Sequence, residues 1–167
     1  LSEDGSKIEA VLECALLWTD AYNESFYSYV NNICTNEGGT HVTGLRAALT
    51  RVVNTFAEST GLLKTFKEGI TGDDIREGLT GVIAVRIKNP EFQGQTKNKL
   101  GSAHVKGWAE QIVGDKLTAY FEQNPDVARA GARRRDRRAA TAARVSVGPR
   151  GSRGVAAVLQ PPLELRD

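Results

Sequence analysis

The sequence has no methionine, only two cysteines and no long apolar run, and each of these features excludes something. A chain that begins at Leu1 and has no methionine is expected to be a piece of a longer protein. No apolar run approaches membrane length, and residues 1–7 are polar rather than signal-like, so we expect a cytoplasmic protein with no membrane partner. Cys14 and Cys34 lack the spacing of a metal site, which favours two thiols over a disulfide and predicts no metal site.

Charge divides the chain into two unlike parts. Residues 1–127 carry 12 Lys+Arg against 17 Asp+Glu, a net charge of −5, whereas residues 128–167 carry 10 Arg against 3 acids, a net charge of +7. The second part also lacks aromatic residues. Three interpretations of it stay open: a disordered basic tail that contacts nucleic acid, a helical extension over residues 128–144, or an out-of-frame reading of a GC-rich gene.

Apolar periodicity predicts the secondary structure between these ends. A period of two is typical of strands and a period near 3.6 of helices. The predicted elements are strands over 12–19, 25–33 and 79–88, long helices over 45–60 and 102–124, and a short helix over 71–78. The first two strands are expected to form an antiparallel hairpin. This order predicts a layered α/β domain with two long helices on one face of a small mixed sheet.

Several polar and aromatic residues have a structural interpretation. Thr40 or Thr43 is expected to cap the first long helix, and Ser102 the second. His41 is interpreted as a hydrogen-bonded structural residue rather than a catalyst. The aromatic side chains of the second strand, Tyr27 among them, are expected to pack against a neighbouring element rather than to stack on bases.

The stretch that organises the domain is a polar, glycine-bracketed loop over residues 93–102. It offers the amide of Gln95, the hydroxyl of Thr96 and the ammonium of Lys97 within three residues, a set of donors that suits phosphate oxygens. A triplet of this kind is usually part of a solvated loop. The motifs around it must therefore decide whether it binds phosphate.

The chain contains four such motifs. They are residues 31–33 with 37–41, residues 44–51, residues 72–79, and residues 95–97 with 99–101. In this order they resemble the second, transducer domain of the DNA gyrase B family, from bacterial type IIA topoisomerases. The resemblance implies a ribosomal-protein-like two-layer fold with a left-handed βαβ crossover, which sequence periodicity does not show. The B subunit of topoisomerase IV shares most of these motifs, so gyrase is a preference between the two.

The resemblance also implies domain boundaries and site residues. Residues 1–7 would be a linker from a preceding ATP-binding domain, residues 8–127 the transducer domain, and residues 128–167 a tail that matches the family poorly. Gln95 and Lys97 match positions that touch the γ-phosphate of ATP, with Lys97 in a catalytic role and Mg²⁺ held mainly by the preceding domain. Arg46 matches a basic position facing the cavity that receives DNA.

At the level of function, the resemblance implies an ATP-hydrolysing, nucleoid-associated DNA topoisomerase that changes DNA supercoiling. Its partners would be DNA, the A subunit of gyrase and a second copy of the B subunit. The segment itself would transmit ATP binding and hydrolysis to clamp closure, and it would be inactive alone. The alternative from another class is a stand-alone nucleic-acid-binding domain of ribosomal type, against which the acidic residues 1–127 argue.

Overall fold

The computed structural model describes residues 10–19, 21–61, 70–125 and 141–147. The predicted linker over residues 1–7 lies outside these ranges, as do residues 128–140 and 148–167 of the predicted tail. In the described part of the chain, no helix is both long and apolar enough to cross a membrane.

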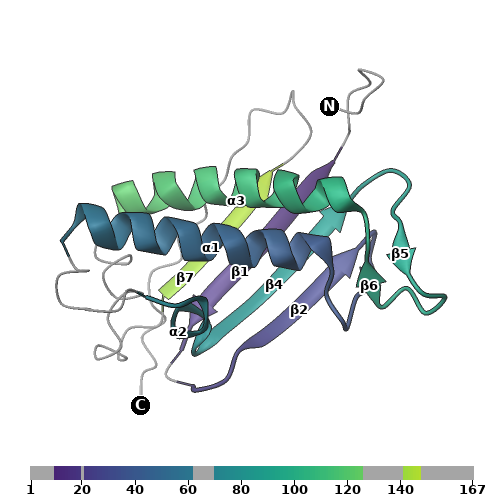
Figure 1. Cartoon of the computed structure of the whole chain (residues 1–167), viewed down its shortest axis with the longest axis horizontal. Coiled ribbons are helices and arrows are strands. Elements are labelled where there is room, and N and C mark those ends of the chain that lie inside the picture. The colour runs from purple at the N-terminus through teal and green to yellow at the C-terminus, as the bar shows by residue number, and fades with distance from the viewer. Residues whose placement is uncertain (1–9, 20, 62–69, 126–140, 148–167) are drawn as a thin grey trace, which may run out of the picture.

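The described residues form a five-stranded sheet, a small two-stranded hairpin and three helices (Figure 1). The strands of the main sheet, in spatial order, are β3 (Ile33–Cys34), β2 (Ser25–Val30), β4 (Leu79–Arg86), β1 (Val11–Trp18) and β7 (Thr141–Val147). The hairpin consists of β5 (Phe92–Gln93) and β6 (Lys99–Leu100). The helices are α1 (Thr40–Ser59), α2 (Gly72–Arg76) and α3 (Ala103–Gln123).

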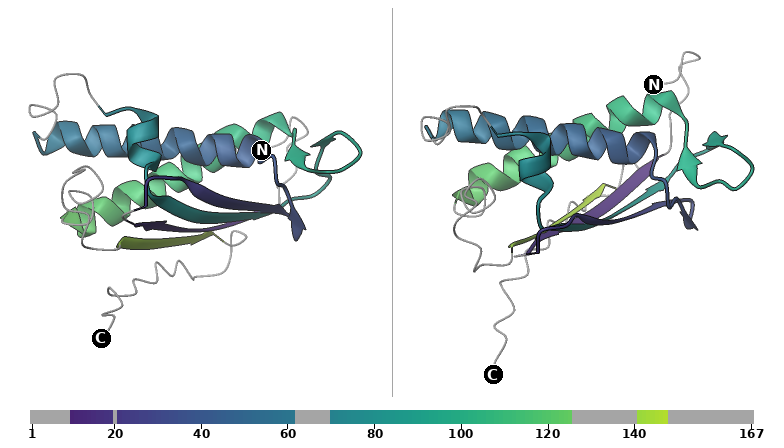
Figure 2. Two further views of the ribbon diagram at one scale, coloured as in Figure 1. Left: turned by 90° about the horizontal axis from the view of Figure 1, so that it is seen from below. Right: turned by 60° about the horizontal axis from the view of Figure 1, so that its bottom comes forward.

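Both long helices cover the same face of the sheet, as Figure 2 shows from below. This arrangement confirms the predicted two-layer α/β domain with two long helices on one face of a mixed sheet. Alternation places one side of β4 in the core, where Leu79, Ile83 and Val85 are fully buried. Helical spacing places Leu49 of α1 and Leu117 of α3 against the same core, also fully buried.

The predicted antiparallel hairpin of the first two strands is wrong. β4 lies between them, antiparallel to β1 with Trp18 opposite Leu79, and parallel to β2 with Val30 opposite Val85. Every second residue of β4 is buried, and hydrogen bonds to β1 and β2 satisfy the backbone on both of its edges. β4 is therefore paired along both edges, and it separates β1 from β2.

The connection from β2 through α1 to β4 runs against the usual handedness. The two strands are parallel neighbours, and α1 crosses in front of the sheet in Figure 1. With both strands pointing upward and the helices toward the viewer, β4 lies to the left of β2, so the crossover is left-handed (Figures 1 and 2). Likeness to a ribosomal protein fold stays a prediction.

Part of the basic tail forms a strand. Residues 141–147 make β7, which pairs antiparallel with β1, with Thr141 opposite Trp18. The expectations of a wholly disordered tail and of a helix continuing to residue 144 are therefore wrong for this segment. Both expectations considered the tail alone. In the structure, β1 would have an open edge without β7, and its backbone supplies the hydrogen-bonding partners for β7.

The start of α1 differs from the predicted cap. The N-cap residue is Gly39, no side chain caps the helix, and the hydroxyl of Thr43 donates back to the Gly39 carbonyl at 3.1 Å. The predicted role of Thr40 or Thr43 as the cap is wrong, because the backbone enters the helix through a glycine at φ 139°. Tyr27 also departs from the expectation of packing, since 59% of it is exposed.

Candidate functional site

The loop singled out by its composition forms the tip of the β5–β6 hairpin. It projects at one end of the domain, beyond the N-terminal ends of α1 and α3 (Figure 1). Gln95, Thr96 and Lys97 are all exposed, so their donors are accessible to solvent. Gly94 turns the chain at φ 81°, and no atom of another described residue beyond its chain neighbours lies within 4 Å of the place a Cβ would occupy there. The tip is thus open on the outside.

Lys97 has an unusual backbone and an available ammonium. Its φ of 55° is left-handed, which few residues other than glycine adopt and which costs on the order of 1–3 kcal/mol. The Nζ atom lies 6.0 Å from the centroid of the Phe92 ring, at the outer limit of a cation–π contact. Among the described residues, the ammonium has no hydrogen bond or ion pair. A cation held this way is free to accept an anionic partner.

The base of the loop is fixed by backbone hydrogen bonds on two sides. The Glu37 amide donates to the Asn98 carbonyl at 3.0 Å, and the Leu100 amide donates to the Gly38 carbonyl at 3.1 Å. On the other side, the hydroxyl of Ser102 accepts from the Glu91 amide at 2.9 Å. Ser102 is the N-cap residue of α3 by position, as predicted, but its side chain makes no hydrogen bond to the helix.

His41 is buried beside this base and belongs to a short polar chain. The Ser28 hydroxyl lies 2.7 Å from the Thr35 hydroxyl, and the Thr35 hydroxyl lies 3.4 Å from Nε2 of His41. The Nδ1 atom has no partner among the described residues. Burial disfavours the charged imidazolium and lowers the pKa of His41 to about 4. The side chain is therefore neutral and structural, as its sequence context predicted.

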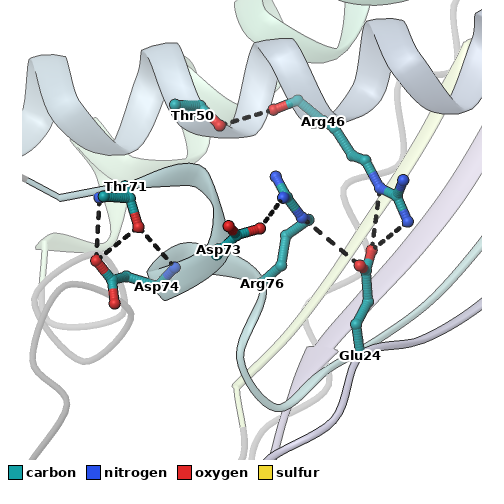
Figure 3. A network of polar contacts seen from close by, with 7 residues as sticks. All are labelled: Glu24, Arg46, Thr50, Thr71, Asp73, Asp74 and Arg76. Carbon is teal, nitrogen blue, oxygen red and sulfur yellow. Dashed lines mark hydrogen bonds and ion pairs between the residues drawn. The ribbon is translucent and has the colours of Figure 1, made fainter.

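Arg46 lies in a separate charged cluster (Figure 3). Its Nε and Nη2 atoms donate to Oε1 of Glu24 at 3.2 and 3.0 Å, and Oε2 of Glu24 lies 3.6 Å from Nε of Arg76. Arg76 also donates to Asp73, so arginines and carboxylates alternate from Arg46 on α1, through Glu24 just before β2, to Arg76 and Asp73 on α2. The structure does not bring Arg46 into the same cluster as the lysine loop.

The cluster borders an open depression of about 270 Å³. Its lining residues are Tyr22, Glu24, Asp73, Asp74, Arg76 and Glu77. Four of the six are acidic, and Asp74 is already engaged in the capping box of α2 with Thr71. A surface with this balance of charge repels anions such as phosphates.

The sequence predicted the donors of the loop, Gln95 and Lys97, but not the residues whose hydrogen bonds hold the base of the loop. Gly39, Ser102 and the amide of Glu37 carry no chemical signature of their own. The pair of glycines before α1 was the available signal, and it indicated only a sharp turn. Neither Glu24 as the partner of Arg46 nor the exposure of Tyr27 was predicted.

Solved structures with the same fold define the class. The 43K ATPase domain of gyrase B from Thermus thermophilus, in complex with an aminocoumarin, matches with a TM-score of 0.69 and 36% identity, over 77% of this chain and 34% of that one. The ATP-binding domain of topoisomerase IV from Francisella tularensis, in complex with a small-molecule inhibitor, matches with a TM-score of 0.66 and 37% identity, over 73% and 33%. The fold is therefore one found in the ATPase region of DNA topoisomerases.

Sequence relatives narrow this class to one family. The DNA gyrase B family profile matches residues 2–145. The B subunit of DNA gyrase from Chlamydia pneumoniae is 52% identical over 129 residues, which cover 77% of this chain and 16% of the relative. That of Treponema pallidum is 47% identical over 153 residues, which cover 84% and 24%. The chain belongs to the DNA gyrase B family, as the motifs predicted, and it spans a quarter or less of these two relatives.

Proposed function

We propose that this chain is the transducer domain of a DNA gyrase B protein and that it transmits ATP binding and hydrolysis to closure of the DNA clamp and strand passage. The observation that carries the proposal is the projecting β5–β6 hairpin, with exposed donors at Gln95 and Lys97 on a fixed base. Such a hairpin reaches a nucleotide in a neighbouring domain without any change in its own domain.

The donors of the hairpin tip fit phosphate oxygens. An ammonium and an amide two residues apart donate to the γ-phosphate of ATP, and Lys97 offsets the charge that develops there in the transition state. ATP with Mg²⁺ is bound mainly by a preceding domain, so this segment alone is inactive. The contact exists only while the γ-phosphate is present. Its loss after hydrolysis changes the relative stability of two domain orientations, which is the physical requirement for a transducer.

The DNA-facing part of the proposal rests on Arg46. Its side chain is 44% exposed although it is paired with Glu24, so it keeps donor capacity for phosphates of a DNA segment in the clamp cavity. The A subunit of gyrase and a second copy of the B subunit complete the assembly, which works in the cytoplasm on the nucleoid. A stand-alone nucleic-acid-binding domain is disfavoured because residues 1–127 have a net charge of −5.

The test is Lys97→Ala in complete gyrase, reconstituted from the A subunit with a full-length B subunit that contains this segment. One charge-assisted hydrogen bond to the γ-phosphate is worth about 1.5–3 kcal/mol, so ATP turnover should fall about 10- to 100-fold and supercoiling with it. Binding of nucleotide should largely persist. The matched control is Lys106→Ala, at an exposed lysine on α3 outside the hairpin, which should turn over ATP normally. Normal turnover by Lys97→Ala would refute the proposal.

The B subunit of topoisomerase IV is the second candidate, because a structure of that enzyme matches about as well as one of gyrase. The two candidates share the proposed lysine contact and differ in the reaction of the whole enzyme. Assembly of the full-length protein with the A subunit of gyrase should give ATP-dependent negative supercoiling of relaxed plasmid. Decatenation without supercoiling would favour the topoisomerase IV assignment.

A further inference from the structure

The base of the lysine hairpin is bonded to the segment that enters α1. The Glu37 amide donates to the carbonyl of Asn98, the residue that follows Lys97, at 3.0 Å. The Leu100 amide donates to the Gly38 carbonyl at 3.1 Å, and Gly39 and Leu100 form a parallel bridge. Two segments that are far apart in the sequence therefore share a short stretch of sheet directly below the tip.

Gly39 makes this approach possible. A Cβ atom at this position would lie 2.5 Å from both the amide nitrogen and the carbonyl oxygen of Leu100, distances that real Cβ atoms essentially never show. The glycine is buried, and its φ of 139° is rarely adopted by residues that have a side chain. It is also the N-cap residue of α1. Any side chain at this position must move β6 away from the helix.

The opposite side of the base is tied to α3. The Gly101 amide donates to the Glu91 carbonyl at 2.7 Å, and the Glu91 amide donates to the Ser102 hydroxyl at 2.9 Å. Ser102 is 1% exposed and immediately precedes α3. Both ends of the hairpin are thus anchored at the N-terminal ends of the two long helices, whereas at Gly94 in the tip no described residue beyond its chain neighbours comes within 4 Å of a Cβ built there.

We propose that Gly39 is a positioning residue for Lys97. Its missing side chain lets the backbone of residues 37–39 hold the base of the hairpin, which sets the left-handed backbone of Lys97 and the direction of its ammonium. Because the same residues begin α1, a displacement of the ammonium is passed to the helix layer instead of being absorbed by bending of the hairpin. This inference rests on the proposed contact of Lys97 with the γ-phosphate.

The experiment is a double-mutant cycle in the same reconstituted gyrase. The variants are Gly39→Ala, Lys97→Ala and the two together. The control is Gly107→Ala on α3, where the part of the chain that the structure describes leaves open space around the added methyl group and turnover should be unchanged. Displacement of a reacting group by about 1 Å costs on the order of 100-fold, so Gly39→Ala should lower kcat for ATP by about 10- to 100-fold with little change in KM.

The double variant separates positioning from general damage. If Gly39 acts through Lys97, adding Gly39→Ala to Lys97→Ala should give no further loss of kcat. Losses that multiply, or wild-type turnover by Gly39→Ala, would overturn the inference and leave the proposed function standing. Wild-type turnover by Lys97→Ala would overturn both.

A second variant keeps the test decisive if Gly39→Ala does not fold, which thermal unfolding will show. Ser102→Ala removes the acceptor of the Glu91 amide on the other side of the base and introduces no clash. It should also lower kcat without adding to the loss in Lys97→Ala. Full turnover by Ser102→Ala, or losses that multiply with those of Lys97→Ala, would then overturn the inference.

Discussion

Lowering the pH should destabilise this chain through one buried imidazole. His41 is 0% exposed, its Nδ1 atom has no partner among the described residues, and its pKa is lowered from 6.5 to about 4 because burial disfavours the cation. The unfolded chain therefore takes up a proton at this residue at a higher pH than the folded chain does. The stability that His41 contributes in its neutral form is fully present above pH 6.5 and is lost as the pH falls from there toward 4.

The size of the effect follows from the two pKa values. One pKa unit corresponds to about 1.4 kcal/mol, so the full loss at low pH is about 3 kcal/mol and the loss at about pH 5 is roughly 2 kcal/mol. The assay is urea unfolding of the chain at about pH 7.5 and about pH 5, for wild type and for His41→Gln, whose side chain does not titrate. The advantage of wild type over His41→Gln should shrink by roughly 2 kcal/mol at the lower pH.

The comparison between variants removes the contribution of the carboxylates, which titrate in both proteins. His104→Gln makes the same substitution at an exposed position on α3 and should change stability at about pH 7.5 by less than about 0.5 kcal/mol. An advantage of wild type over His41→Gln that is equal at both pH values would show that the imidazole titrates alike in the folded and unfolded chain. The burial argument would then be wrong.

Three further predictions concern stability, each measured by urea or thermal unfolding. Gly81→Ala should lower the free energy of unfolding by about 1–3 kcal/mol, because the new methyl group would overlap the Phe26 ring. Gly107→Ala, which meets no described residue within 4 Å, should raise it by about 0.5–1 kcal/mol. Equal effects of the two substitutions would contradict the packing argument. Thr71→Ala should cost about 1 kcal/mol through loss of the capping box of α2. Leu49→Ala, at a fully buried position, should cost about 2–5 kcal/mol, and a smaller loss would show that the core collapses around the cavity.

The local parts of the fold were predictable because their signals lie within one element. Alternation along residues 79–88 predicted β4, since one side of the strand packs under the helices. The hydroxyl and acids at the start of α2 predicted a helix N-terminus, and Thr71 and Asp74 form the reciprocal capping box there. Strand pairing was not predictable in this way. The turn-rich residues between β1 and β2 suit a hairpin, but β4, which follows much later in the chain, pairs with both strands and lies between them.

In the candidate site, too, the local features were predictable and the long-range contacts were not. The types of donor in Gln95 and Lys97 and their spacing were visible in the sequence, as was the family to which the motifs belong. The pairing of Arg46 with Glu24 was not, because a charged residue on a helix gives no indication of which distant carboxylate it will meet.

By itself, the amino-acid sequence determined the helices α1, α2 and α3, the strands β1, β2 and β4, the chemistry of the lysine loop and membership of the DNA gyrase B family, because periodicity, side-chain type and motif order are properties of neighbouring residues. Only the tertiary structure decided where that chemistry lies. The contact between Gly39 and Leu100 brings together the entrance of one helix and the base of a hairpin formed much later in the chain. Such a contact depends on the packing of the whole helix layer against the sheet, and no local pattern encodes it.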